Sequence, residues 1–249
     1  MVYVYGVVAT TGDHPPAAEG IEAAPVRLVR KGDLGALVSE LDTGSLSAPQ
    51  AVRAHWRVLE EAARDTTVIP TRFAMVLESD EAVAQRLLEA NAPTLHELLA
   101  RLQGKVQLTL KGDYDEDRML RELVDTDPAI AELRERVRAV SDEAGYFDRI
   151  RLGELISQAF DRFRAADTDA ALARLEPVAE AVRVQDVRRA AAAFDLAFLV
   201  PRDRIEAFSS AVQAFDRDVG DRIGLSYVGP APPYSFAEAN LDEEAPAWA

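Results

Sequence analysis

Alternation of hydrophobic and polar positions predicts β-strands in several parts of the chain. The opening segment Val2–Ala9 is apolar at odd and even positions alike, as in a strand covered on both faces. Residues 26–30 and 34–40 form the next two strands, and Lys31-Gly32-Asp33 between them has the composition of a hairpin turn. The Gly- and Pro-containing residues 10–24 predict an exposed loop. Further strands are expected at 66–77, 106–110, 182–187, 194–200 and 223–228.

Apolar residues spaced three or four positions apart predict the helices. The first helix is expected to run from an N-cap at Ser47 to about Arg64. Its predicted apolar stripe comprises Val52, Trp56, Leu59 and Ala63. Thr168 and Asp203 are the expected N-caps of two later helices, the second in capping-box order with Glu206. The other helices are expected at 80–91 with Ser79 as N-cap, at 93–102 with Gly104 after their end, and over much of 116–180.

Pro70 interrupts the strand pattern of 66–77, because proline cannot donate a hydrogen bond to a β-ladder. We therefore expect an edge, a bulge or a bend at this position. Arg72 and Phe73 follow directly. The favoured interpretation is that Arg72 holds the bend through carbonyl or carboxylate oxygens, and the alternative is that it recognises a partner.

The last strand leads into Gly229-Pro230-Ala231-Pro232-Pro233, where we expect the strand to stop. Three prolines stiffen this segment, so Tyr234 and Phe236 lose less conformational entropy on docking than they would after a flexible linker. The favoured interpretation is a proline-rich end that packs back on the body of the protein and closes the domain. The alternative is a surface that binds a partner.

The order of elements predicts an α+β fold with two domains, because the hydrophobic period changes from about 3.6 to 2 residues near Gly104. After that point the order is strand, helices, strand, strand, helix, strand. This is the order of a ferredoxin-like (split βαβ) domain with extra helices inserted in its first crossover. The predicted division is an N-terminal α+β domain at 1–103, the ferredoxin-like domain at 104–236 and an acidic tail at 237–249.

Composition excludes several classes of function. The 249 residues carry 28 Lys and Arg against 43 Asp and Glu, a formal net charge of -15, which repels nucleic acids and anionic lipids. There are no cysteines, so disulfides and thiolate metal sites are impossible. No apolar run approaches the roughly 20 residues that span a bilayer, and the N-terminus lacks a signal-peptide pattern. We therefore expect a cytoplasmic protein.

The sequence contains no motif that predicts an active site, a cofactor or a metal. Phosphate-binding glycine loops, a nucleophile elbow and a zinc-binding histidine pair are all missing from the sequence. His55 lies beside the apolar stripe of its helix, and His14 and His96 are distant in sequence, so no helix carries two histidines. We interpret His55 as a packed or hydrogen-bonded residue.

Two blocks give the sequence a resemblance to the gas vesicle accessory protein F/L family. In the first, His55 with Val58-Leu59 precedes Val68-Ile69-Pro70-Thr71-Arg72-Phe73, similar to the family's helix and its V-x-P-x-R-F-G block. In the second, Leu225-Ser226-Tyr227-Val228-Gly229-Pro230-Ala231-Pro232-Pro233-Tyr234-Ser235-Phe236 is similar to its terminal Y-x-G-P-W-P-P-Y-x-F. Ala197-Phe198-Leu199-Val200 and the opening strand also fit. Ala74 stands where the family usually has Gly, and Ala231 where it often has Trp.

The resemblance implies a non-enzymatic accessory or minor structural protein needed to build the gas vesicle, a cytoplasmic compartment with a protein wall. The implied partners are the small hydrophobic shell protein and other gas vesicle accessory proteins. As a physical hypothesis, open sheet edges and exposed aromatic side chains could hold an apolar shell subunit by strand addition or groove packing. The candidate contacts are Arg72, Phe73, Tyr234 and Phe236.

Two other functions stay open at this point. One is an enzyme or small-ligand binding protein built on the ferredoxin-like domain, a scaffold that supports many activities. Such a function would be indicated by a pocket with converging polar groups and a histidine or carboxylate whose pKa is shifted. The other is a regulatory module that joins accessory proteins to one another, which differs from the first hypothesis mainly in its partner.

Overall fold

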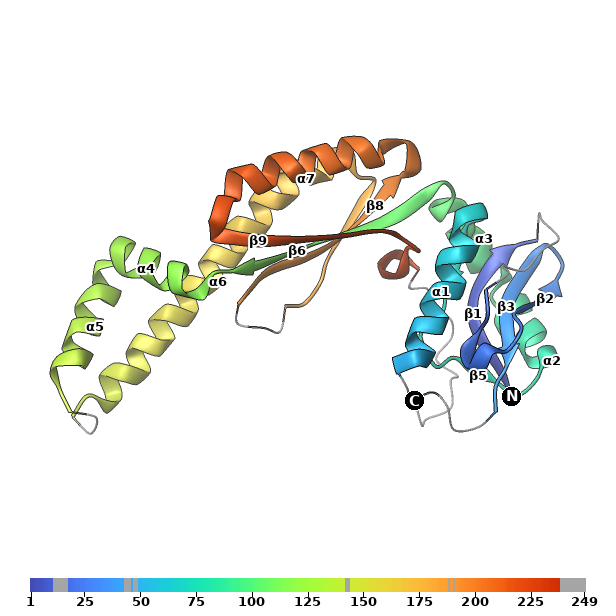
Figure 1. Ribbon diagram of the computed structural model, residues 1–249, viewed down its shortest axis with the longest axis horizontal. Coiled ribbons are helices and arrows are strands. Elements are labelled where there is room, and N and C mark those ends of the chain that lie inside the picture. Colours follow the sequence, from blue (N-terminus) through green and yellow to red (C-terminus); the bar gives the residue numbers. More distant parts are fainter. Residues whose placement is uncertain are drawn as a thin grey trace. The chain divides into compact units, whose positions relative to one another are not determined.

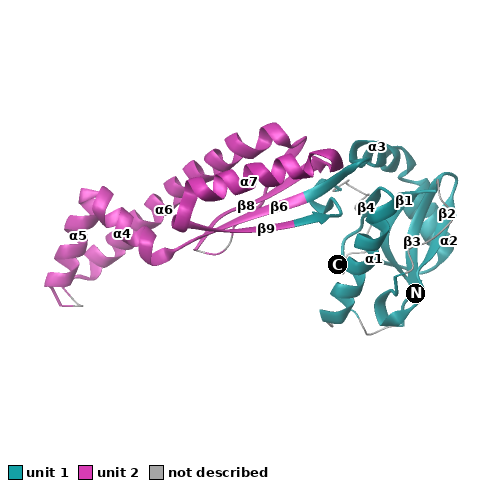
Figure 2. Cartoon of the chain, turned by 45° about the horizontal axis from the view of Figure 1, so that its top comes forward, with its two compact units in different colours: residues 1–107, 229–249 teal, residues 108–228 magenta. Residues whose placement is uncertain are grey.

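The computed structural model of the protein describes residues 1–10, 18–42, 46, 49–141, 144–187, 189 and 191–237. The chain divides into two compact units (Figure 2). Unit 1 comprises residues 1–107 and 229–249, and unit 2 comprises residues 108–228. Each unit combines helices with antiparallel strands, so the predicted α+β class is confirmed. The predicted acidic tail lies outside the described residues from residue 238 onward.

Unit 1 is built on a five-stranded sheet with β1 (Val2–Ala9) at its centre. β1 pairs antiparallel with β3 (Leu34–Glu40), and β3 pairs with the edge strand β2 (Arg27–Lys31). Gly32 has a φ of 61° in the turn between β2 and β3, which confirms the predicted hairpin. The short strands β4 (Val68–Pro70) and β5 (Val76–Leu77) pair with opposite ends of β1, which confirms a bent segment after Pro70.

Helices cover both faces of this sheet, which is why β1 is buried almost along its whole length (Figure 1). α1 (Pro49–Asp65) packs on β1 and β4. On the other side α2 (Asp80–Ala82) continues as the π-helical segment η2 (Val83–Glu89), followed by α3 (Ala92–Leu102). The Ser79 hydroxyl accepts a hydrogen bond from the amide of Ala82 at 3.2 Å, as its predicted N-cap role requires.

Two predictions for unit 1 are wrong. Val52 and Trp56 are exposed, because α1 turns Ala51, Ala54, His55, Val58, Leu59 and Ala62 toward the sheet instead. The predicted exposed loop before β2 buries Ala18 and Ile21, and Ile21 belongs to the short 3₁₀ helix η1 (Ile21–Ala23). Ser47, the predicted N-cap of α1, lies outside the described residues.

Unit 2 is built on a four-stranded sheet in the order β7-β8-β6-β9 (Figure 1). The strands are β6 (Lys105–Tyr114), β7 (Ala181–Val184), β8 (Ala192–Pro201) and β9 (Ile223–Ala231). The helices are α4 (Glu116–Thr126), α5 (Pro128–Ala139), α6 (Tyr146–Leu175) and α7 (Ile205–Val219). α5 and α6 pack against each other around Ile130 and Ala159, as their apolar stripes predicted.

Three predicted boundaries in unit 2 are wrong. Thr168 caps no helix, since α6 passes through it and ends at Leu175. Asp203 lies inside the 3₁₀ turn η4 (Arg202–Arg204), one residue too early to cap α7. β9 passes Gly229 and ends only at Ala231, because Gly229 and Pro230 fit at the edge of a sheet.

Candidate functional site

Five aromatic side chains gather in unit 1 around one histidine, and we call these six residues the His55 cluster. Its members are Tyr3, Tyr5, His55, Trp56, Phe73 and Tyr234. Tyr3 and Tyr5 lie two residues apart on β1 and therefore face the same side, toward α1. The bend after β4 supplies Phe73, and the 3₁₀ turn η6 (Tyr234–Phe236) supplies Tyr234.

Hydrogen bonds fix the centre of the His55 cluster. The Tyr3 hydroxyl lies 2.9 Å from His55 Nδ1 and accepts a bond from the Ala74 amide at 3.1 Å. His55 Nε2 is hydrogen-bonded to the Tyr234 hydroxyl. A neutral imidazole has one donor and one acceptor nitrogen, and a tyrosine hydroxyl can complement either. Both nitrogens are thus satisfied, which confirms that His55 is a packed, hydrogen-bonded residue.

The rings pack closely around these bonds. The Phe73 ring meets the imidazole edge-on, with centroids 5.8 Å apart at 86°. The Trp56 and Tyr234 rings are 4.5 Å apart. The Trp56 and Phe73 side chains are partly exposed to solvent, whereas His55 is buried. The cluster therefore presents aromatic surface outside and a satisfied polar centre inside.

Burial keeps the cluster uncharged at neutral pH. Desolvation lowers the pKa of His55 to about 4, and the backbone carbonyl of Thr71 opposes this shift only in part. Desolvation also raises the pKa of the Tyr3, Tyr5 and Tyr234 hydroxyls. The Tyr5 ring lies 5.7 Å from the imidazole between centroids, and its hydroxyl is hydrogen-bonded to the Ser39 hydroxyl and the Ile21 amide, each at 2.8 Å.

The aromatic tail packs back on the body of the protein, as the favoured interpretation of the sequence expects, but it packs on unit 1, whereas the predicted division placed Tyr234 and Phe236 in the C-terminal domain. Tyr234 packs against the core between β1 and α1, and Phe236 is buried. Polar groups hold the turn in place: the Ser235 amide donates to Gln107 Oε1 at 2.9 Å, and the Arg101 guanidinium donates to the Phe236 carbonyl.

The structure brings two of the four candidate contact residues to one centre, since Phe73 and Tyr234 both pack against His55. Arg72 is exposed, and among the described residues its guanidinium has no hydrogen-bond or ion-pair partner. Within those residues the structure gives no support to the favoured interpretation of Arg72 as a residue that holds the bend through its guanidinium. Partner binding by Arg72, Phe73, Tyr234 and Phe236 stays a prediction.

Sequence reasoning did not find Tyr3, Tyr5 or Trp56 as members of this group. Tyr3 and Tyr5 did carry a signal, because two tyrosines with polar hydroxyls alternate in an otherwise apolar buried strand. Trp56 carried none, since it was assigned to the buried stripe of α1.

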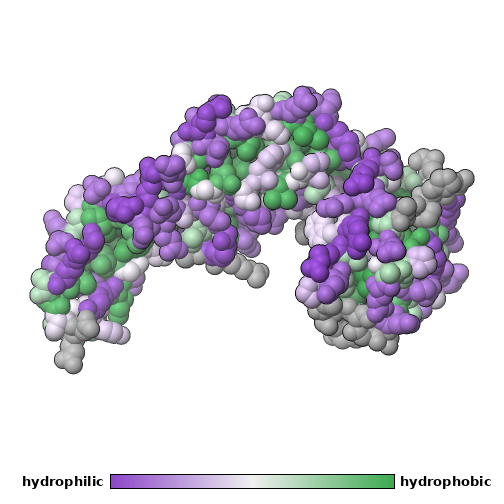
Figure 3. All heavy atoms as spheres, viewed as in Figure 1, coloured by the Kyte–Doolittle hydropathy of each residue, from purple (hydrophilic) through white to green (hydrophobic). Residues whose placement is uncertain are grey.

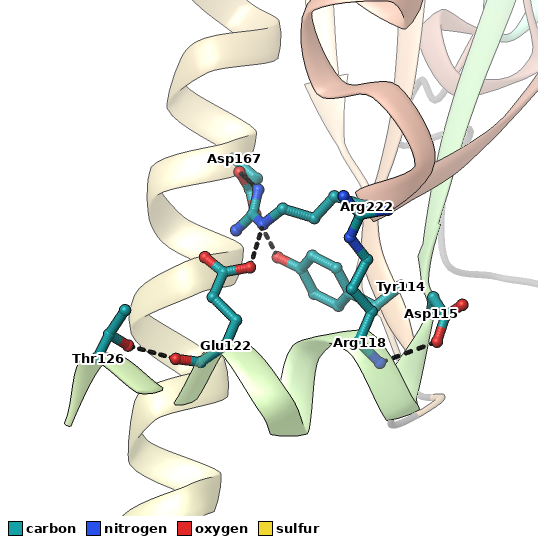
Figure 4. Close-up of polar contacts among 7 residues, drawn as sticks. All are labelled: Tyr114, Asp115, Arg118, Glu122, Thr126, Asp167 and Arg222. Atoms are coloured by element: carbon teal, nitrogen blue, oxygen red, sulfur yellow. Dashed lines mark hydrogen bonds and ion pairs between the residues drawn. The ribbon is translucent and has the colours of Figure 1, made fainter. Parts of the chain in front are cut away.

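A second polar group, in unit 2, joins the β6 end, α4, α6 and the turn before β9 (Figure 4). Asp167 on α6 accepts the Tyr114 hydroxyl at 2.6 Å and two bonds from Arg222, at 2.7 and 2.9 Å. The Arg222 Nε donates to Glu122 at 3.2 Å. Burial and the neighbouring Asp167 raise the pKa of Tyr114. Because both carboxylate oxygens of Asp167 are hydrogen-bonded, this group resembles a structural ion pair that holds α6 to the sheet more than a reactive site.

Neither group offers an evident place for chemistry. In the described part of the chain, His, Asp and Glu side chains form no set of three that could hold a metal ion. None of the helices among those residues is both long and apolar enough to cross a bilayer. Hydrophobic side chains do reach the surface in both units, between hydrophilic ones (Figure 3).

Comparison with known proteins gives one consistent result. The family profile described as "Gas vesicle synthesis protein GvpL/GvpF" matches residues 1–238. Gas vesicle protein F of Streptomyces sp. (strain CB03234) is 32% identical over 241 residues, covering 95% of this chain and 99% of the relative. Gas vesicle protein L of the same strain is 31% identical over 260 residues, covering 94% and 92%.

Two solved structures have the same fold. The crystal structure of GvpF from Anabaena sp. PCC7120 matches with a TM-score of 0.81 and 25% identity, covering 96% of this chain and 98% of that one. GvpF from Microcystis aeruginosa matches with a TM-score of 0.81 and 24% identity, covering 96% and 99%. The likeness therefore extends over both units.

Proposed function

This chain belongs to the gas vesicle synthesis protein GvpL/GvpF family, and on that premise we propose that it is a non-enzymatic accessory or minor structural protein of gas vesicle assembly. It acts in the cytoplasm and at the gas vesicle by binding the shell protein or other accessory proteins. The observation that carries this proposal is the match of nearly the whole chain, in sequence and in fold, to gas vesicle proteins F and L.

The His55 cluster supports a binding role. Tyr3 and Tyr234 engage both nitrogens of His55, and burial lowers the pKa of the imidazole to about 4, so the centre of the cluster is a hydrogen-bonded group of low basicity. The exposed residues Arg72 and Phe73 lie on the bend beside this centre. A hydrogen-bonded support under an aromatic and a guanidinium group is typical of protein contact sites.

We also propose the finer architecture implied by the sequence. The strand order β7-β8-β6-β9 is the order of a ferredoxin-like sheet, and α4 and α5 lie in the first crossover as inserted helices. This supports a ferredoxin-like C-terminal domain at 104–236 after an N-terminal domain at 1–103. The compact units follow somewhat different limits, because residues 229–237 group with unit 1.

Co-purification of the tagged full-length chain with the gas vesicle shell subunit tests the proposed function. We expect the shell subunit to be retained by the parent chain and to be lost or much reduced with Phe73→Ala and with Arg72→Ala. Phe147→Ala, which removes an exposed aromatic of unit 2, is the matched control and should bind as the parent does. If Phe73→Ala, Arg72→Ala and Tyr234→Ala fold and bind normally, these residues are structural only.

A further inference from the structure

β9 is an edge strand of the unit 2 sheet and lacks the usual protection of an edge. It is the last strand in the order β7-β8-β6-β9, so one of its sides has no strand partner among the described residues. The segment from Ile223 to Val228 contains no charged residue and no proline. Most of its side chains are exposed, and Val228 retains 56% of its accessible surface. Pro230 interrupts the edge only beyond this segment.

The other edges in the described structure are all protected. Proteins protect edge strands by making them short or by placing charged residues or proline on them. β2 carries Arg27, Arg30 and Lys31, and Arg27 is paired with Glu40 and Asp80. β4 has three residues and ends in proline, and β5 has two. β7 has four residues, one of them an arginine.

The two faces of β9 differ in their contacts, because one faces α7 and the other does not. Tyr227 faces α7, where its hydroxyl lies 3.0 Å from the Ser209 hydroxyl and its ring stacks on Phe208. Successive side chains of a strand point to opposite faces, so Ser226 and Val228 lie on the face away from α7. Tyr227 is thus held in place, while the backbone edge and Val228 are free to meet another chain.

We propose that residues 223–228 of β9 form a strand-addition site, which accepts an extended, uncharged, apolar segment of a partner polypeptide as a fifth strand of the unit 2 sheet. The backbone amides and carbonyls of the edge would give affinity, and the side chains of Ser226 and Val228 would contact alternate residues of the added strand. This inference rests on the proposed function, which supplies the partner, and it names the mode of binding.

The net charge of the chain favours a different polypeptide, and not a second copy of this chain, as the strand added to β9. Each copy carries a formal net charge of -15, so two copies repel each other, while β9 offers no opposite charge to offset that repulsion. An uncharged apolar strand meets no such penalty. It also matches an edge on which six successive residues are uncharged.

Binding of the shell subunit to charge variants at the two edges of this sheet tests the inference. Val228→Lys places a cation on the β9 edge, and Val184→Lys places one on β7 at a residue with 59% exposure. Because both side chains are exposed, circular dichroism should show both variants folded. We expect Val228→Lys to weaken binding of the shell subunit at least tenfold and Val184→Lys to leave it unchanged.

Hydrogen exchange on the parent chain gives a second measurement that needs no variant. The shell subunit should protect amides of residues 224–228 and leave those of β7 unchanged. Normal binding by Val228→Lys, or no added protection in β9, would overturn the strand-addition site and leave the proposed function standing. No binding of the shell subunit by the parent chain would instead overturn shell binding as the proposed function. Self-association that Val228→Lys abolishes would show that a second copy occupies the edge, which also overturns the inference.

Discussion

The His55 imidazole is buried between the Tyr3 and Tyr234 hydroxyls, and its pKa is lowered to about 4 from an ordinary value of 6.5. As the pH falls below about 6.5, the unfolded chain binds a proton at this histidine and the folded chain does not. Proton uptake therefore favours unfolding until the pH reaches about 4, where the folded state also becomes protonated. A difference of about 2.5 pH units corresponds to about 3 kcal/mol.

We predict that this histidine makes unit 1 less stable at mildly acidic pH. Chemical denaturation between pH 7 and pH 4 should show a loss of stability for the parent chain that is larger, by up to about 3 kcal/mol, than the loss for His55→Gln. Glutamine can still donate and accept hydrogen bonds but does not titrate in this range. Equal pH dependence of the two proteins would mean that His55 is not protected from protonation in the folded state.

Ala74 is a second residue with a measurable effect, because its φ of 69° lies in the left-handed region that favours glycine. Its amide donates to Tyr3, so the strained conformation is part of the His55 cluster. We predict that Ala74→Gly raises the free energy of unfolding by about 1 kcal/mol. Ala166→Gly, at an exposed position within α6, should lower it by about 1 kcal/mol. If Ala74→Gly lowers the free energy of unfolding, the backbone conformation of Ala74 is not strained.

At the scale of elements, α6 is held to the sheet of unit 2 by Asp167. We predict that Asp167→Ala lowers the free energy of unfolding by about 3 kcal/mol or more, because Arg222 and Tyr114 lose a buried partner. Asp161→Ala on the same helix removes an exposed carboxylate and should change stability by less than about 0.5 kcal/mol. Denaturant titration measures the free energy of unfolding of both variants. Similar values for the two would mean that Asp167 does not hold α6 to the sheet.

The sequence was sufficient for most elements because their period and turn residues are local signals. The hairpin at Gly32, the Ser79 N-cap and the α5–α6 pair were all predicted. Predictions failed where tertiary contacts outweigh local preference. Thr168 has the chemistry of an N-cap, yet α6 continues through it, as the neighbouring Asp167 is bonded to Arg222 from another element.

The candidate site could be predicted only in part. Phe73 and Tyr234 were singled out, but 161 positions separate them in the sequence, and no local pattern places both against His55. The same limit applies to Arg72, whose guanidinium has no partner within the described part of the chain, because the sequence does not reveal whether the fold brings a carboxylate within reach. Contacts of this kind follow from the topology of the sheet and not from periodicity.

At the scale of the whole molecule, unit 1 is made from both ends of the chain. We predict that Phe236→Ala destabilises unit 1 by about 3 kcal/mol, because it removes a buried ring from the turn that carries Tyr234. Hydrogen exchange should then quicken in β1 and α1. Phe147→Ala, at a ring that is 81% exposed, should leave exchange unchanged. Unchanged protection in Phe236→Ala would mean that the tail contributes nothing to unit 1.

The central claim is that this protein takes part in building gas vesicles through contacts with other vesicle proteins. The most direct measurement is the yield of buoyant vesicles in cells of the source organism from which the gene has been deleted. We predict that the deletion strain forms few or no vesicles, and that the parent gene restores them whereas a gene encoding Phe73→Ala restores them poorly. Normal vesicle formation in the deletion strain would contradict the account.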